Sequence, residues 1–153
     1  MKRKIICLFL SIVLLLSALI IPSYATDADD DLISVGLEWT EMSFSFNEGI
    51  WNDTTHAYED RGWISAEDGG EITVNNNGSV AVRVSFDYVA SQGFEDISVC
   101  FLAEEQAIFT QDIETNKSVT VSVSPTGEPS ETFEDAQMGT VVITVTKIEE
   151  VTQ

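Results

Sequence analysis

Apolar and polar residues alternate with a period of two along most of the chain beyond residue 31. The alternation is clear over 33–39, 42–46, 80–88 and 119–123. Successive side chains of a strand point to opposite faces of a sheet, so this pattern predicts β-strands with one face in a core.

The apolar phase shifts between Trp39 and Met42. Because an odd step moves the apolar set to the other face of a strand, a bulge or bend is expected at Thr40-Glu41.

Turn residues separate the remaining strands. Asn77-Gly78 is typical of a tight hairpin between a strand holding Ile72 and Val74 and a return strand running from Val80 to Tyr88. Further strands are expected at 97–102, at 107–109 after a turn at Glu104-Glu105, and at 140–148, with 47–60 and 126–139 as long connections. The run 97–102 is almost continuously apolar, which predicts a deeply buried strand.

These elements define the fold class and the domain boundaries. Seven to nine strands without an amphipathic helix predict an all-β, antiparallel, immunoglobulin-like β-sandwich. The sandwich is expected to be a single domain over 32–149, preceded by a disordered acidic leader over 26–31.

The first 25 residues have the pattern of a secretory signal peptide. A basic start at 2–4 is followed by an apolar run over 5–21 and by small residues before a cleavage point between Ala25 and Thr26. We expect a signal helix that is removed, giving a secreted or cell-surface protein without a membrane segment. An uncleaved signal anchor is the alternative.

The charge of the chain restricts its partners. Seven basic residues face 26 acidic ones, and three of the basic residues lie in the signal peptide, so the mature chain carries a net charge of −22. Such a surface repels nucleic acid. The favoured interpretation is a solvated acidic surface, and a basic or cationic partner is the alternative.

Residues suited to catalysis are scarce. The mature chain has one cysteine, Cys100, in an apolar setting that predicts a buried, inert thiol, and one histidine, His56. Neither a zinc-ligand spacing nor a nucleophile elbow is present. The sequence therefore predicts a protein that is not an enzyme.

No cofactor is expected from the sequence, and calcium is the alternative, because two connections carry many carboxylates. These candidate ligands are Glu48, Asp53, Glu59, Asp60, Glu67 and Asp68. Loop carboxylates bind calcium at extracellular concentrations, although an acidic chain has acidic loops in any case.

Aromatic residues suggest a second kind of site. Trp51, Tyr58 and Trp63 could form a platform for sugar rings, as in carbohydrate-binding modules. A place in the core is the favoured interpretation for Trp51 and Trp63, and more strongly for Trp39.

Two stretches carry a resemblance to known proteins. Residues 37–63 read LEWTEMSFSF, then GIWN, THAY and GW, and residues 72–88 read ITVNNNGSVAVRVSFDY. Together they resemble small secreted or surface proteins of Firmicutes with an immunoglobulin-like sandwich, and more distantly the biofilm-fibre subunits of the TasA/camelysin type. The resemblance implies a fold and a compartment, and it transfers no catalytic or binding residue.

The function expected from the sequence is that of a secreted, non-enzymatic bacterial surface, extracellular-matrix or adhesion protein with a protein or glycan partner. The alternatives are a carbohydrate-binding module that uses the tryptophan-rich loop, and a calcium-dependent self-assembling subunit.

Overall fold

The computed structural model describes residues 8–15, 31–67 and 69–149. These residues form strands and connections, with no helix among them, so the all-β prediction is confirmed for the described part of the chain. No described segment therefore offers a helix able to cross a membrane. The long connection predicted over 126–139 is confirmed over 127–136, which form no regular element, whereas 137–139 belong to the last strand.

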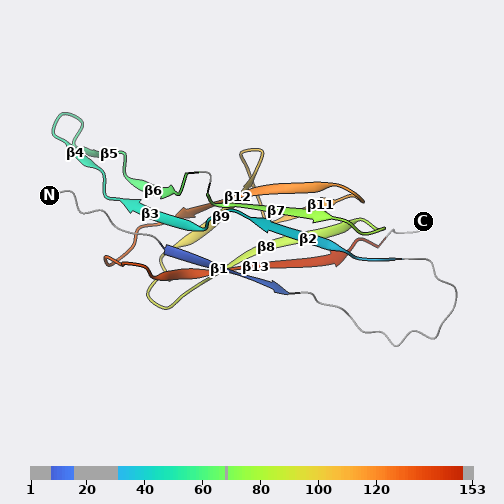
Figure 1. Ribbon diagram of the computed structural model, residues 1–153. Helices are drawn as coiled ribbons and strands as arrows, with labels where there is room; N and C mark the ends of the chain where they lie inside the picture. The colour runs from blue at the N-terminus through green and yellow to red at the C-terminus, as the bar shows by residue number, and fades with distance from the viewer. Residues whose placement is uncertain (1–7, 16–30, 68, 150–153) are drawn as a thin grey trace.

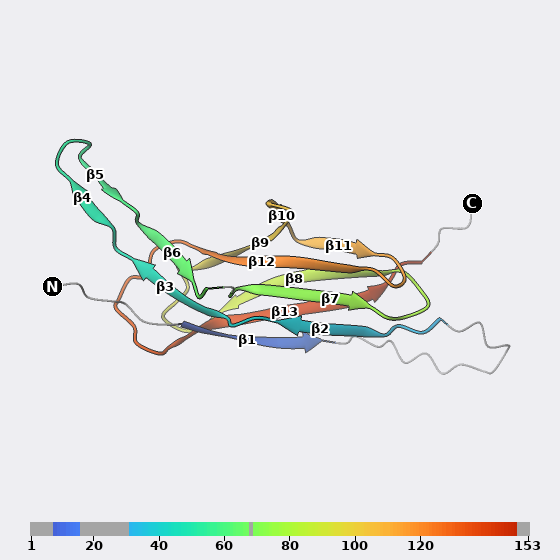
Figure 2. The same ribbon diagram turned by 45° about the horizontal axis from the view of Figure 1, so that its top comes forward.

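Two sheets enclose one core (Figures 1 and 2). Sheet A has the order β11 (Thr110–Ile113), β8 (Val82–Ala90), β13 (Gln137–Lys147), β1 (Leu8–Leu15), β3 (Ser43–Asn47), β6 (Gly62–Ser65). Sheet B has the order β10 (Gln106–Ile108), β9 (Ser98–Ala103), β12 (Ser118–Thr126), β7 (Glu71–Asn76), β2 (Val35–Trp39). A separate pair, β4 (Ile50–Asn52) and β5 (Ala57–Glu59), projects beyond one end of the sheets.

The core lies between the inner faces of both sheets. The Phe86 ring of β8 meets the Phe101 ring of β9 with their centroids 5.5 Å apart. Val74, Val121 and Ile143 are fully buried around them. The period-two prediction is confirmed most clearly on β8, where Val82, Val84 and Phe86 are buried and Arg83 and Asp87 are exposed.

The bend predicted at Thr40-Glu41 marks a change of sheet. The chain leaves β2 in sheet B and enters β3 in sheet A, and the Thr40 amide donates to the Glu71 carbonyl over 3.0 Å. The altered apolar phase therefore keeps both strands facing one core while the chain crosses between layers.

The hairpin predicted at Asn77-Gly78 is wrong. Strand β7 belongs to sheet B and β8 to sheet A, so the connection arches between the layers, and neither residue has a positive φ. The Asn76 side chain, fully buried, holds this arch. Its amide nitrogen donates to the carbonyls of Val80 (2.8 Å) and Ile113 (3.1 Å), and its oxygen accepts from the Gly78 amide (3.0 Å).

The turn predicted at Glu104-Glu105 is confirmed. Ala103 pairs with Gln106, and both glutamates have positive φ, as a two-residue hairpin with a type I′ turn requires.

Two placements differ from the sequence predictions. Trp39 is 59% exposed, because it ends β2 at the edge of sheet B, where no further strand of that sheet covers it. Cys100 is exposed on β9, since that strand alternates and only Phe101 is fully buried. The prediction of a buried thiol is therefore wrong.

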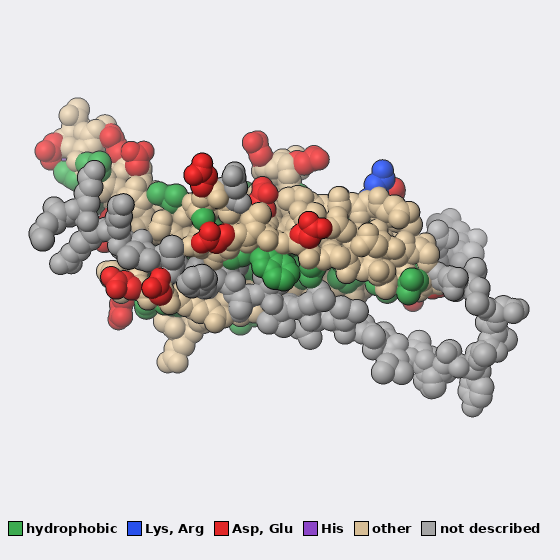
Figure 3. Space-filling view, in the orientation of Figure 1, with side chains coloured by type: hydrophobic (Ala, Val, Ile, Leu, Met, Phe, Trp, Pro, Cys, Tyr) green, Lys and Arg blue, Asp and Glu red, His purple; other side chains and the backbone are tan. Residues whose placement is uncertain are grey.

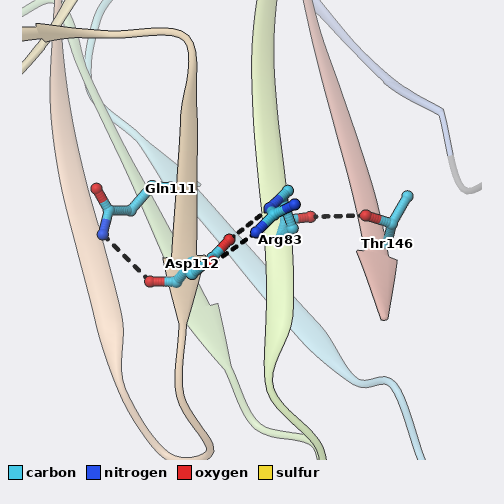
Figure 4. A network of polar contacts seen from close by, with 4 residues as sticks. All are labelled: Arg83, Gln111, Asp112 and Thr146. Carbon is cyan, nitrogen blue, oxygen red and sulfur yellow. Dashed lines mark hydrogen bonds and ion pairs between the residues drawn. The ribbon is translucent and has the colours of Figure 1, made fainter. Parts of the chain in front are cut away.

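A polar row crosses the outer face of sheet A (Figure 4). Arg83 lies opposite both Asp112 of β11 and Thr146 of β13, and its guanidinium binds the Asp112 carboxylate through two bonds of 2.6 and 2.8 Å. Hydrogen bonding to Arg83 lowers the pKa of Asp112, and the same bond raises the pKa of Arg83. The row ties the edge strand β11 to the sheet.

The Asn76 contacts give a test of the arch. Asn76→Ala leaves buried backbone groups without partners and is expected to cost about 2–4 kcal/mol of the free energy of unfolding, measured by urea denaturation. The control is Asn75→Ala, which loses one exposed bond of 3.3 Å to Glu38. Equal losses for both variants would contradict this role of Asn76.

Tyr88 makes stability depend on alkaline pH. Desolvation raises its pKa to about 12, and its hydroxyl donates to the Met138 carbonyl over 2.8 Å. Because the pKa of Tyr88 is higher in the folded protein than in the unfolded chain, its contribution to the free energy of unfolding is complete below pH 10 and is lost as the pH rises toward 12. This contribution is about 1–2 kcal/mol. Thermal unfolding between pH 8 and 12 measures this loss. The loss of stability at alkaline pH is expected to disappear in Tyr88→Phe and to remain in Tyr58→Phe. The same decline in both variants would refute the assignment to Tyr88.

Candidate functional site

The tryptophan-rich segment forms a hairpin, where the sequence predicts only a long connection. Strands β4 and β5 pair with each other and with no other described strand. At the turn, the Asn52 side-chain oxygen accepts from the amides of Thr54 (2.8 Å) and Thr55 (3.3 Å), and the Asn52 carbonyl accepts from the His56 amide. We call residues 48–61 the arm.

The arm presents an aromatic pair to solvent. Trp51 and Tyr58 lie directly opposite each other, with ring centroids 5.3 Å apart in an edge-to-face arrangement. Trp51 is 48% exposed, Tyr58 53% and the neighbouring Ile50 74%. The Trp51 indole donates to the Asp53 carboxylate over 2.8 Å. The interpretation of Trp51 as a core residue is therefore wrong.

Trp63 is placed differently from the other two aromatic candidates. It lies on β6, half-buried against the core, and its indole donates to the Gly127 carbonyl over 2.9 Å. Its ring meets Phe46 edge-to-face at 5.2 Å. The structure thus brings Trp51 and Tyr58 together on the arm, whereas Trp63 packs against the core between the two sheets.

Most of the proposed calcium ligands lie on or near the arm. Glu48, Asp53, Glu59 and Asp60 belong to the arm, Glu67 follows β6, and Asp68 lies outside the described residues. Glu59 accepts from the Asn52 amide, and Asp53 from Trp51. Within 8–15, 31–67 and 69–149 no three carboxylate, histidine or cysteine side chains converge to hold a metal ion. Calcium binding stays a prediction.

A hollow of about 270 Å³ opens at the base of the arm. It is lined by Phe46, Glu48, Tyr58, Arg61 and the segment 129–132. The Arg61 guanidinium lies 5.3 Å from the Tyr58 ring centroid and 5.8 Å from that of Phe46, and it binds Glu128 over 2.7 Å. These two rings therefore already accept a cationic group.

A larger hollow of about 650 Å³ lies between the β9–β10 turn and the segment that joins β11 to β12. It contains Lys117 together with Glu104 and Glu114, over the apolar side chains of Ile108 and Val119. Its mixed charges and open shape point to no single ligand.

Strand β1 occupies a gap in sheet A. It runs parallel to β13, with Leu10 opposite Gly139, Ile12 opposite Val141 and Leu14 opposite Ile143, whereas its other neighbour β3 meets it at two residues. All other strand pairs in the described part of the chain are antiparallel. Leu8–Leu15 lie within the predicted signal helix but form a strand in this chain; the rest of that segment lies outside the described residues.

The direction of the β13 backbone follows from its neighbours. The Met138 carbonyl accepts from the Ser91 amide, and the Ile148 amide donates to the Ala81 carbonyl. The backbone N–H and C=O groups of the even-numbered residues of β13 therefore point toward β8. The direction of these groups alternates along a strand, so the N–H and C=O groups of Gly139, Val141 and Ile143 point toward β1. These groups therefore lie on the side of β13 that pairs with β1.

Close packing against the Tyr88 ring requires a glycine at position 139 of β13. A Cβ atom there would lie 2.4 Å from the Tyr88 ring, so only glycine lets that ring pack across β13. The gap in sheet A therefore begins beside a tightly packed part of the core.

Comparisons with known proteins found no match: no family model fits the chain, and no curated protein or solved structure is significantly similar to it.

The arm is expected to unfold independently of the sandwich. A two-stranded hairpin is marginal by itself, and Trp51→Ala removes an aromatic pair worth about 0.5–1.5 kcal/mol. Amide protection over 50–59 should then disappear in hydrogen-exchange NMR, while protection of β7, β8 and β12 stays. A parallel loss throughout the sandwich would show that the arm is part of its cooperative unit.

Proposed function

We propose that this chain is a secreted, non-enzymatic structural subunit of a bacterial surface or extracellular matrix, with an immunoglobulin-like sandwich that assembles by strand addition. The observation that carries the proposal is the place of β1 in sheet A. That strand comes from the predicted signal peptide, so its removal opens the β13 edge over Gln137–Thr144.

An open strand edge is a strong site for association. It presents unpaired N–H and C=O groups that another strand can satisfy, and here the edge lies beside a buried core instead of at the rim of the sheet. The register of β1 supports a strand of about seven residues as the natural occupant, parallel to β13. We assign that strand to a second copy of the chain.

The charge of the subunit sets the conditions for assembly. Copies that each carry −22 repel one another, and this repulsion weakens as salt screens it. Backbone pairing does not depend on a bound ion, so assembly is expected to rise with sodium chloride and to persist in EDTA. Loss of assembly in EDTA would favour the calcium-dependent alternative.

The carbohydrate-binding alternative has one supporting observation. Trp51 and Tyr58 are exposed on the arm, but their edge-to-face arrangement and the separate position of Trp63 give no shared flat surface for a sugar ring. Strand addition is therefore the better supported function.

Residues 26–153 provide the test. Size-exclusion chromatography with light scattering is expected to show association that grows with concentration and salt. A peptide with the sequence of Leu8–Leu15 between terminal lysines should fill the gap, return the protein to a monomer and raise its melting temperature, whereas a scrambled peptide should not.

A pair of variants localises the effect. Val142→Lys places a charge on the stretch that faces β1, and edge lysines oppose strand pairing. Thr146→Lys adds the same charge to β13 beyond the residues paired with β1. Assembly should fall at least about tenfold for Val142→Lys and little for Thr146→Lys. A mature chain that stays monomeric and ignores the peptide would overturn the proposal.

A further inference from the structure

The arm is a projecting surface that the assembly described above does not use. It extends beyond the end of the two sheets, far along the molecule from the β7–β8 connection (Figures 1 and 2). Ile50, Trp51 and Tyr58 are each about half exposed or more. Large apolar side chains gathered on a projecting hairpin are typical of an interaction surface.

Carboxylates surround this aromatic surface. The arm holds Glu48, Asp53, Glu59 and Asp60 with one basic residue, Arg61, and that residue already binds Glu128. In Figure 3 acidic side chains flank the hydrophobic patch of the arm. The charge of the arm therefore favours a cationic partner.

The rings themselves favour the same chemistry. Arg61 lies over the rings of Tyr58 and Phe46, so two cation–π contacts are present at the base of the arm. Trp51, the stronger cation binder, is half exposed on the same hairpin face as Tyr58. The adjacent hollow of about 270 Å³, with Glu48 and Glu131 in its lining, has room for a long cationic side chain.

A second copy of this chain is a poor occupant. Its mature part has four basic residues, and Arg61, Arg83 and Lys147 already form ion pairs with Glu128, Asp112 and Asp31. Trp51 and Tyr58 share one face of the hairpin, with carboxylates along both strands. This extended face suits a polypeptide better than a small polyamine, since a polypeptide can place several cationic side chains along it.

We propose that the arm is a docking site for a lysine- or arginine-rich segment of a different protein, held by Trp51 and Tyr58 and by the carboxylates around them. This interaction is independent of strand addition at β13, so either can fail without the other.

The test measures the binding of fluorescein-labelled decalysine and decaarginine to residues 26–153 by anisotropy at physiological salt. Trp51→Ala/Tyr58→Ala is expected to weaken binding about fivefold or more at unchanged net charge. The control is Trp39→Ala, which removes an exposed tryptophan from β2 and should change affinity less than about twofold.

Charge variants keep the test valid if the aromatic double variant unfolds the arm. Glu48→Gln/Asp53→Asn/Asp60→Asn leaves both rings in place and should weaken binding about fivefold. Glu104→Gln/Glu105→Gln/Glu114→Gln removes the same charge from the β9–β10 turn and the β11–β12 segment, and it should have little effect.

Three results would overturn the proposal. Equal losses for the arm variants and their matched controls would mean that bulk charge alone attracts the peptides. Spermine that binds as tightly as decalysine, with the same dependence on Trp51, would identify a free polyamine as the ligand. Binding to a glycan array that depends on Trp51, without peptide binding, would identify a carbohydrate site.

Discussion

The structure depends on how the backbone of β13 is satisfied. This strand of eleven residues pairs with β8 along one side over nine residue pairs, and its inward side chains, including Val141, Ile143 and Val145, form the centre of the core. Its other side needs a partner as well, because unpaired backbone groups beside a core are costly. In this structure β1 provides that partner. Under the proposed function, removal of residues 1–25 takes this partner away, and a second copy of the chain replaces it at the same strand edge.

Local pattern predicted the strands well and their partners less well. The period-two alternation of 80–88 and the phase shift at Thr40-Glu41 correspond to β8 and to the change of sheet, because both follow from which face meets the core. The Asn77-Gly78 turn was wrong, since the choice between a hairpin and an arch depends on a buried contact, Asn76 with Ile113, that is distant in sequence. Trp39 and Cys100 were misplaced for a related reason: exposure at a sheet edge or on an outer face is set by neighbouring strands.

The candidate sites were harder to predict than the fold. Trp51, Tyr58 and Trp63 were predicted as one platform, and the structure brings only the first two together. The hairpin that places those two opposite each other rests on the Asn52 turn, which lacks the glycine of common hairpins. The place of β1 in sheet A could not be inferred from the sequence, because the apolar run over 5–21 predicts a signal helix and carries no information about strand pairing. The acidity of the chain indicated both cation binding and a solvated surface. The structure places a carboxylate beside the Trp51 ring on the arm, and among the described residues no set of metal ligands converges.

Hydrogen exchange along β13 tests the central claim most directly. In dilute, monomeric residues 26–153, the amides of Gly139, Val141 and Ile143 should exchange quickly, while those of Val142 and Thr144, which point toward β8, stay protected. At assembling concentrations, or with the Leu8–Leu15 peptide, both sets should be protected. Protection of Val141 and Ile143 in the isolated monomer would contradict the account, because the edge would then be closed without a second copy.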